Sequence, residues 1–236
     1  MNGPVLVVAA HPDDEVFGCG GTISRWASEG RTIDVLLIAD GENSRAVGES
    51  QMVEAQLLEK RNAAARNACR ILGCSSVQLL ALPDNRLDRL ELLDIVKKIE
   101  GYIEKLKPVT LLTHHAGDVN IDHRVVHDAV ITACRPQPGH PVQELLFFEV
   151  PSSTEWRPPG SAAPFLPNYF VDITNTLETK LAALQPYETE IRDFPHPRSL
   201  KAIKALARWR GATVGVEAAE SFILGRKLIS NQYISL

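Results

Sequence analysis

The sequence predicts an α/β fold in three layers, with a mostly parallel β-sheet between two layers of helices. Two observations lead to this expectation. Short apolar runs rich in β-branched residues alternate with longer amphipathic segments, which is the pattern of successive βαβ units. The first run, Pro4–Ala10, is apolar throughout, as strands buried on both faces of a sheet are. The 236 residues are 44% hydrophobic, which provides for one sizeable core.

The expected strands are the short runs of this kind. Each is apolar or alternating and is bounded by polar residues or glycine, as strands between turns are. They are expected at Pro4–Ala10, Ile33–Ala39, Val77–Leu82, Val109–Thr113, Glu144–Val150 and Tyr169–Ile173.

Helices are expected where apolar residues recur with helical spacing and glycine or proline marks the end. Gly30 ends the first helix, Gly73 ends the second and Pro136 follows the fourth. Two stretches are expected to be loops, the polar Gly41–Ser50 and the Pro- and Ser-rich Pro151–Pro167. The expected helices span Thr22–Glu29, Met52–Leu72, Leu90–Leu106, Asp122–Cys134, Leu177–Leu184 and Ser199–Gly211.

No segment has the composition of a linker, so we expect a single domain over residues 1–236. Residues 1–150 should form a Rossmann-like core of βα units. Residues 151–236 should add a loop, a strand and helices to the same core.

Charge and composition exclude several classes of protein. The chain has 25 Lys+Arg and 29 Asp+Glu, and its formal net charge of -4 provides no basic surface for nucleic acid. No run approaches the ~18 apolar residues of a membrane span, and the N-terminus lacks a signal-peptide pattern. The four cysteines are too scattered for a disulfide framework or a cysteine zinc site. We therefore expect a cytoplasmic protein with a small-molecule substrate, no nucleic-acid partner and no integral membrane segment.

Histidines and carboxylates gather where two of the expected strands end. His11, Asp13 and Asp14 follow the first strand, and Asp122 and His123 follow the fourth. Because the carboxyl ends of parallel strands lie at one edge of a sheet, where ligands bind, these two groups should meet. Adjacent acids beside an apolar strand are costly unless a cation compensates them. Imidazole and carboxylate together suit Zn²⁺ best, with Fe²⁺ or Mn²⁺ as alternatives.

A catalytic zinc site needs three protein ligands and one open position. From the spacing we expect one ion per chain, held by His11, Asp14 and His123, with His127 as an alternative third ligand. Asp13 is expected to accept a proton from the attacking water, whose pKa zinc lowers towards ~7.

The sequence AHPDDE at Ala10–Glu15, together with Asp122-His123, resembles the PIG-L/LmbE-like family of zinc-dependent N-acetylglucosaminyl deacetylases. Three further features extend the resemblance over residues 1–150: GCGGT at Gly18–Thr22, Arg61, and LPD at Leu82–Asp84.

The resemblance implies the same zinc ligands and the same base as the spacing does. It also implies that Arg61 and Asp84 lie near the sugar. We expect His114, at the end of the fourth strand, to contact the substrate as well.

One position departs from the common pattern of the family. Many members have His-x-Asp-His, whose first histidine stabilises the tetrahedral intermediate and protonates the leaving amine. This chain has Asn120 at that position. An amide can donate a hydrogen bond to an oxyanion but cannot supply a proton at neutral pH. We therefore expect Asn120 to contact the oxyanion and Asp13 to protonate the amine, with His114, His115 and His127 as alternatives.

Asp122 is expected to orient His123, to cap the following helix, or both. Two other motifs are incomplete. His123 and His127 have the spacing of a HExxH zinc motif, but an arginine stands where that motif requires glutamate. Gly18–Gly21 lacks the third glycine of a dinucleotide-binding loop, since Ile23 occupies its place.

These observations predict a zinc-dependent hydrolase that removes the acetyl group from an N-acetylated amino sugar or its glycoconjugate. Its products are acetate and a free amine. One alternative is a zinc amidohydrolase acting on a non-sugar acyl-amide, and another is a weakly active metal-containing glycan-binding protein. The sequence leaves open the group attached to the sugar, the native metal and the oligomeric state. A homo-oligomer is compatible with the resemblance.

Overall fold

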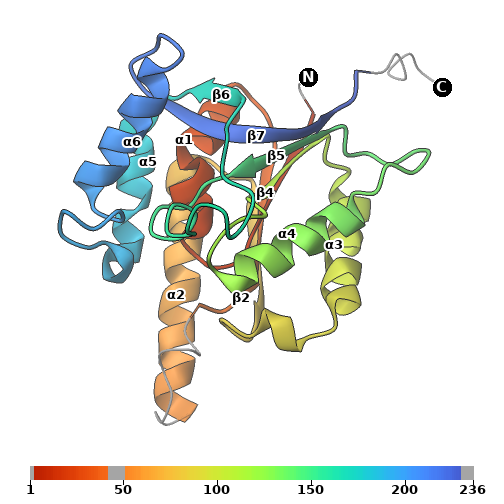
Figure 1. Ribbon diagram of the computed structural model, residues 1–236. Helices are drawn as coiled ribbons and strands as arrows, with labels where there is room; N and C mark the ends of the chain where they lie inside the picture. Colours follow the sequence, from red (N-terminus) through yellow and green to blue (C-terminus); the bar gives the residue numbers. More distant parts are fainter. Residues whose placement is uncertain (1–2, 42–50, 230–236) are drawn as a thin grey trace.

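A computed structural model of the chain describes residues 3–41 and 51–229 (Figure 1). The strands of this part of the chain are β1 (Val5–Ala9), β2 (Ile33–Ala39), β3 (Ser76–Leu82), β4 (Thr110–His114), β5 (Glu144–Phe148), β6 (Tyr169–Asp172) and β7 (Ala219–Lys227). They form one sheet in the order β3-β2-β1-β4-β5-β7-β6. The strands from β1 to β5 are parallel, whereas β7 is antiparallel to both β5 and β6. The mostly parallel sheet expected from the sequence is confirmed.

The helices of the described residues are α1 (Asp14–Ser28), α2 (Gln51–Leu72), α3 (Leu92–Leu106), α4 (Ile121–Ala133), α5 (Leu177–Ala183) and α6 (Leu200–Ala212). Short 3-10 turns occur at η1 (Leu87–Arg89) and η2 (Gln185–Glu190). Helices α1, α2, α5 and α6 pack on one face of the sheet, and α3 and α4 pack on the other (Figure 1). The expected three layers are therefore confirmed. Of the two expected loops, Pro151–Pro167 contains no helix or strand, and Gly41–Ser50 lies outside the described residues except for Gly41.

Strand β1 shows why a continuous apolar run is needed at the centre of this sheet. Its side chains alternate between two cores, with Val7 in the core beneath α1 and α2, and Leu6 and Val8 in the core beneath α3 and α4. All three are at most 1% exposed. The apolar side chains on each face of β1 are thus covered by a different layer of helices.

Helix α1 begins at Asp14, well before the expected start at Thr22. Glycine disfavours helix in isolation, but here it permits close packing that outweighs this preference. A Cβ on Gly21 would lie 2.8 Å from Ile173, and one on Gly18 would overlap the Phe148 ring. These glycines therefore allow α1 to pack closely against the sheet.

Strand β7 was not expected from the sequence. It inserts between β5 and β6, and its carboxylate Glu220 accepts hydrogen bonds from the backbone N–H groups of Gly21 and Thr22. These bonds satisfy N–H groups next to Cys19, where α1 departs from helical geometry at φ −147°. Lys180 donates a hydrogen bond of 2.6 Å to the same carboxylate, so the buried charge is paired.

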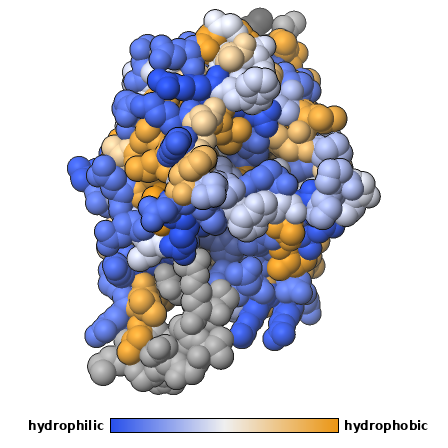
Figure 2. Space-filling view, turned by 60° about the vertical axis from the view of Figure 1, so that its left-hand side comes forward, coloured by the Kyte–Doolittle hydropathy of each residue, from blue (hydrophilic) through white to orange (hydrophobic). Residues whose placement is uncertain are grey.

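The outer surface is mixed in polarity. On the described part of the face shown in Figure 2, hydrophobic side chains form small patches separated by hydrophilic ones. Within residues 3–41 and 51–229, none of the helices combines the length and apolar character that a membrane crossing requires.

Candidate metal centre

The candidate site lies where the direction of chain winding reverses. Strands β1 and β4 are neighbours, but α1 follows β1 to one face of the sheet and α4 follows β4 to the other. Such a reversal opens a crevice beyond the carboxyl ends of the two strands. The segment His11–Asp14 enters this crevice from β1, and the segment Asp118–His123 enters it from β4. The meeting of the two groups expected from the sequence is confirmed.

A sharp turn after β1 places the acidic residues. The Asp13 backbone has φ 124°, a strained value for a residue other than glycine, and its carbonyl accepts hydrogen bonds from Val16 and Phe17 N–H. The Asp13 N–H donates to Glu15 Oε2 at 3.0 Å, and the His11 N–H donates to Asp14 Oδ2 at 2.9 Å. The turn is therefore held by side chains of its own acidic residues.

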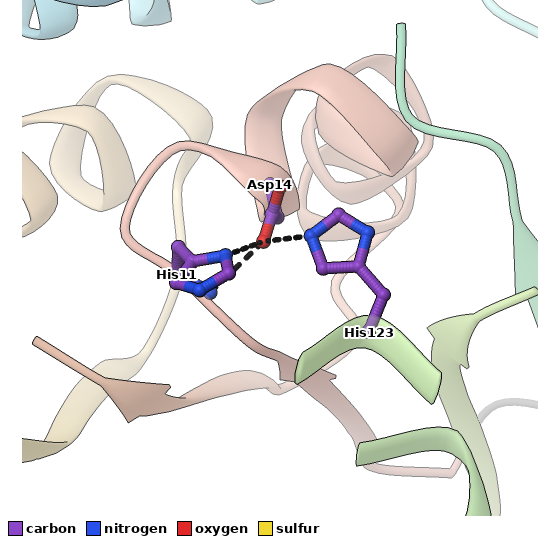
Figure 3. A group of neighbouring side chains, drawn as sticks. All are labelled: His11, Asp14 and His123. Atoms are coloured by element: carbon purple, nitrogen blue, oxygen red, sulfur yellow. Dashed lines mark hydrogen bonds and ion pairs between the residues drawn. The ribbon is translucent and has the colours of Figure 1, made fainter. Parts of the chain in front are cut away.

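Asp14 lies between two imidazoles that come from different elements (Figure 3). Its Oδ2 is 3.2 Å from His11 Nδ1 and 3.2 Å from His123 Nε2. One ligand atom from each of the three residues lies within 4.8 Å of the other two. In a tetrahedral zinc site, bonds of roughly 2.1 Å put ligand atoms roughly 3.4 Å apart, close to the two spacings here.

Each imidazole is fixed on its far side by carboxylates. His11 Nε2 is 3.0 Å from Asp122 Oδ2 and 3.1 Å from Asp84 Oδ1. His123 Nδ1 is 3.1 Å from Asp118 Oδ2. The expectation that Asp122 orients His123 is therefore wrong, because Asp122 contacts His11 and Asp118 contacts His123. Carboxylates in this position set the tautomer and orientation of metal-binding histidines.

Asp118 is itself held firmly, which makes it a rigid partner for His123. Its Oδ1 accepts a hydrogen bond from Asn120 N–H at 2.8 Å and another from the Ser153 hydroxyl. Its Oδ2 accepts a hydrogen bond of 2.8 Å from the Thr154 hydroxyl. The loop after β5 is thereby tied to the segment that carries His123.

The electrostatics of the site favour positive charge. Burial lowers the pKa of His123, but the charges of Asp14 and Asp118 outweigh it and raise the pKa to about 9. Burial also lowers the pKa of His11, and hydrogen bonds with Asp122, Asp14 and Asp84 raise it well above the usual value. Burial raises the pKa of Asp14, but the facing histidines bring it well below its usual range. The carboxylates around the two imidazoles therefore favour a positive charge at this position.

This donor set fits a divalent cation. The Oδ1 atom of Asp14 is buried and has no hydrogen-bond partner among the described residues. Such an atom is expected where a carboxylate can coordinate a cation. A second group, His11, Asp84 and Asp122, has the same close spacing. The Asp122 carboxylate, however, already accepts N–H hydrogen bonds from Asn85 and Leu87. We therefore favour the first group as the ligand set.

Asp13 lies beside this ligand set and is 3% exposed. Burial raises the pKa of its carboxyl to about 6, against the opposing effect of Arg198. Its neighbour Glu15 is fully buried, accepts a hydrogen bond of 2.7 Å from the Tyr187 hydroxyl, and has its pKa raised by burial to about 8. Asp13 is thus a buried carboxylate at the edge of the candidate ion site.

Two residues from the fourth-strand segment take places other than expected. Asn120, not Asp122, is the N-cap of α4, since its side chain accepts a hydrogen bond from Asp122 N–H at 2.8 Å. His114 is fully buried, stacks on His123 with ring centroids 3.9 Å apart, and accepts a hydrogen bond from Ala10 N–H. A direct substrate contact by His114 is therefore contradicted by its position behind the site.

The other two histidines near the site are engaged with backbone carbonyls. His127 donates from Nδ1 to the carbonyl of His114 at 2.8 Å, and His115 donates from Nε2 to the carbonyl of Ala163 at 2.9 Å. Both are nearly buried. These bonds give His115 and His127 structural roles, which disfavours them as acids for the leaving amine.

Of the expected sugar contacts, Asp84 reaches the site and Arg61 lies at its edge. Asp84 is beside His11, as described above, and is 3% exposed. Arg61 is 5% exposed and donates to Glu190 Oε1 at 2.9 Å and to the carbonyl of Gly41 at 3.1 Å. Their contact with a sugar stays a prediction.

Sequence reasoning gave no role to two residues that the structure places at the site. Asp118 lies in the segment after β4, and only its contact with His123 shows its role. Arg198 bonds to Asp13 from a segment far along the chain. Asp118 has a weak local signal in the sequence, because it is a carboxylate shortly before a candidate metal-binding histidine. Arg198 has no local signal.

Comparison with known proteins places these motifs in a family. A sequence model of the PIG-L family, described as GlcNAc-PI de-N-acetylase, matches residues 6–134. An uncharacterized deacetylase of Escherichia coli strain K12, YaiS, is 30% identical over 191 residues, which are 78% of this chain and 90% of the relative. A diacetylchitobiose deacetylase of Thermococcus kodakarensis is 27% identical over 92% of this chain and 80% of its own length. A 4-oxalmesaconate hydratase of Pseudomonas putida is 29% identical over 78% of this chain and 74% of its own length.

Proposed function

The chain belongs to the PIG-L family, and on that basis we propose that it is a zinc-dependent N-deacetylase acting on an N-acetylglucosamine-type sugar or its glycoconjugate. The observation that carries this proposal is the Asp14 carboxylate between the imidazoles of His11 and His123, with the buried carboxylate of Asp13 beside them. The products are acetate and the free amine of the sugar.

His11, Asp14 and His123 would hold the ion. When bound, the ion supplies Lewis-acid polarisation of the amide carbonyl and lowers the pKa of a water molecule. Two imidazoles and one carboxylate occur at catalytic zinc sites, and a site with given donors generally binds Zn²⁺ more tightly than Fe²⁺ or Mn²⁺, so we favour zinc. The orientation of the two imidazoles by Asp122, Asp84 and Asp118 supports this assignment.

Asp13 acts as the base and then as the acid. Its carboxylate accepts a proton from the attacking water, whose oxygen forms a bond to the amide carbon. When the carbon–nitrogen bond breaks, Asp13 returns the proton to the departing nitrogen. This double role is supported by His114, His115 and His127, because one ring nitrogen of each is engaged in a hydrogen bond with the backbone.

Asn120 is the proposed side-chain donor to the oxyanion that forms on the carbonyl. Its Oδ1 caps α4, which fixes the side chain and leaves the two Nδ2 hydrogens as donors. The Nδ2 atom is 3.4 Å from Asn85 Oδ1, a long contact that a better acceptor can replace. A fixed donor aimed at developing charge is worth several kcal/mol in other acyl-transfer sites.

An acetate-release assay tests the proposed function. The purified chain is loaded with Zn²⁺ and incubated with N-acetylglucosamine, diacetylchitobiose and a panel of non-sugar N-acetyl amines. We expect acetate and primary amine in equal amounts from the sugars. Release from the non-sugar amides alone would indicate the amidohydrolase alternative, and sugar binding by calorimetry without acetate would indicate a glycan-binding protein.

The hydratase relative provides a further competing outcome. Hydration of a carbon–carbon double bond needs a positioned water and a proton donor but no leaving amine. Incubation with 4-oxalmesaconate, followed by the loss of absorbance of its conjugated double bond, tests this reaction. Water addition in the absence of acetate release from every sugar would replace the proposed function.

A further inference from the structure

A side chain from the C-terminal part of the chain reaches the proposed base. Arg198 lies between η2 and α6, and its Nη1 donates to Asp13 Oδ2 at 3.1 Å. The two residues are 185 positions apart in sequence. The Arg198 side chain is 17% exposed and Asp13 is buried, so solvent screens this ion pair only weakly.

Arg198 is immobilised by contacts on several sides. The same Nη1 donates to Glu190 Oε2 at 3.1 Å, and Nε donates to Ser152 Oγ at 2.8 Å. The guanidinium carbon lies 4.9 Å from the centre of the Phe17 ring. A planar guanidinium held in this way is preorganised, so it holds its partner in one orientation.

Glu190, which binds Arg198, is itself held by a second arginine. Glu190 is 1% exposed, and it also accepts a hydrogen bond from Arg61 through its other carboxylate oxygen at 2.9 Å. The buried carboxylate therefore lies between two arginines and fixes the position of both. This arrangement gives Arg61 a described role in the support of Arg198, in addition to its predicted contact with the sugar.

The contact with Arg198 makes the two oxygens of Asp13 different. Oδ2 is bound to the guanidinium, whereas Oδ1 is buried and has no hydrogen-bond partner among the described residues. The backbone of Asp13 is strained at φ 124°, so its side chain starts from an uncommon position that surrounding contacts must maintain. Turning the carboxylate out of this orientation would break its contact with Arg198.

We propose that Arg198 is the positioning residue for Asp13, holding Oδ2 so that Oδ1 takes the proton of the attacking water. This inference rests on the proposed function for its catalytic meaning. The opposing role would be a direct contact between Arg198 and the substrate. Positioning affects the rate of the chemical step, whereas a substrate contact affects binding.

Three variants test the proposal: Arg198→Ala, Arg198→Lys, and Arg192→Ala as a matched control. Arg192 belongs to the same segment but donates only to backbone carbonyls in the described contacts, at Thr189 and Ile191. Zinc content and melting temperature are measured for each variant before kinetics. The kinetic assay is acetate release from the sugar that the wild-type chain hydrolyses best.

We expect Arg198→Ala to lower kcat by about 100-fold with KM changed by less than about threefold, the order expected for a misplaced catalytic group. Low concentrations of guanidinium chloride that leave the melting temperature unchanged should restore part of kcat in Arg198→Ala only. Arg198→Lys should retain more activity than Arg198→Ala, and Arg192→Ala should match the wild type. A rise in KM at unchanged kcat, or no rescue by guanidinium, would overturn the proposal.

A readout independent of activity separates this inference from the proposed function. Crystal structures of metal-free wild type and Arg198→Ala should show one Asp13 rotamer in the first and more than one in the second. His11, Asp14 and His123 should keep their positions in both. An Asp13 carboxylate that stays in place without Arg198 refutes the positioning role. A wild-type chain that releases no acetate refutes the proposed function and leaves the structural comparison to decide the role of Arg198.

Discussion

Replacing Asp118 with asparagine keeps the size of the side chain but removes the charge that faces His123. In the native chain Asp118 Oδ2 accepts from the Thr154 hydroxyl at 2.8 Å and lies 3.1 Å from His123 Nδ1. In the variant an NH₂ group takes the place of one of the two carboxylate oxygens, Oδ1 or Oδ2. If that group faces His123, two N–H donors oppose each other, and the imidazole loses the tautomer that leaves Nε2 free to bind an ion.

The magnitude follows from the burial of this contact. Asp118 and His123 are at most 1% exposed, so water cannot replace the lost acceptor. Loss of such an outer partner of a metal-binding histidine costs about 10- to 100-fold in metal affinity. This corresponds to about 1.4–2.7 kcal/mol of binding free energy. We expect Asp118→Asn to weaken zinc binding within this range.

Competition titration against a chromophoric zinc chelator measures the affinity of the wild type and the variant. Asp94→Asn, at an exposed position in the first turn of α3, is the matched control and should bind zinc like the wild type. Circular dichroism checks that Asp118→Asn remains folded. An affinity within twofold of the wild type would refute the reasoning that the carboxylate fixes the imidazole.

Three further predictions concern stability and the ion. Lys180→Met leaves the buried carboxylate of Glu220 without its cation and should lower the free energy of unfolding by about 3 kcal/mol in urea titration; an unchanged midpoint and slope would contradict the pairing seen here. Ser199→Ala removes the hydroxyl that caps α6 by accepting from Ala202 N–H at 3.1 Å, and should cost about 1 kcal/mol in the same assay, a loss that Ser199→Asp should largely avoid. Zinc at 100 times its Kd should stabilise the metal-free chain by about 2.7 kcal/mol, seen as a higher melting temperature that a chelator reverses; an equal shift in a His123→Ala variant would place the ion elsewhere.

Local patterns in the chain were enough to predict most of the fold. The apolar and alternating runs placed five parallel strands, because strands of a parallel sheet between two layers of helices are mostly apolar. The pairing of His11 with Asp14 was also local, since a turn of three residues brings both side chains to one point. His123 followed from the rule that neighbouring parallel strands end at one edge of the sheet.

Contacts between distant segments decided the remaining features. Strand β7 carries charged residues at Glu220, Arg226 and Lys227, so its sequence pattern did not predict a strand. Only its pairing with β5 in the folded chain shows it. Which carboxylate lies beside each imidazole depended on how the segments after β3, β4 and β5 pack together. Asp118 lies beside His123, and Asp122 lies beside His11. Arg198 reaches Asp13 from 185 positions away, and no local pattern encodes such a contact because only the packed chain brings the two side chains together.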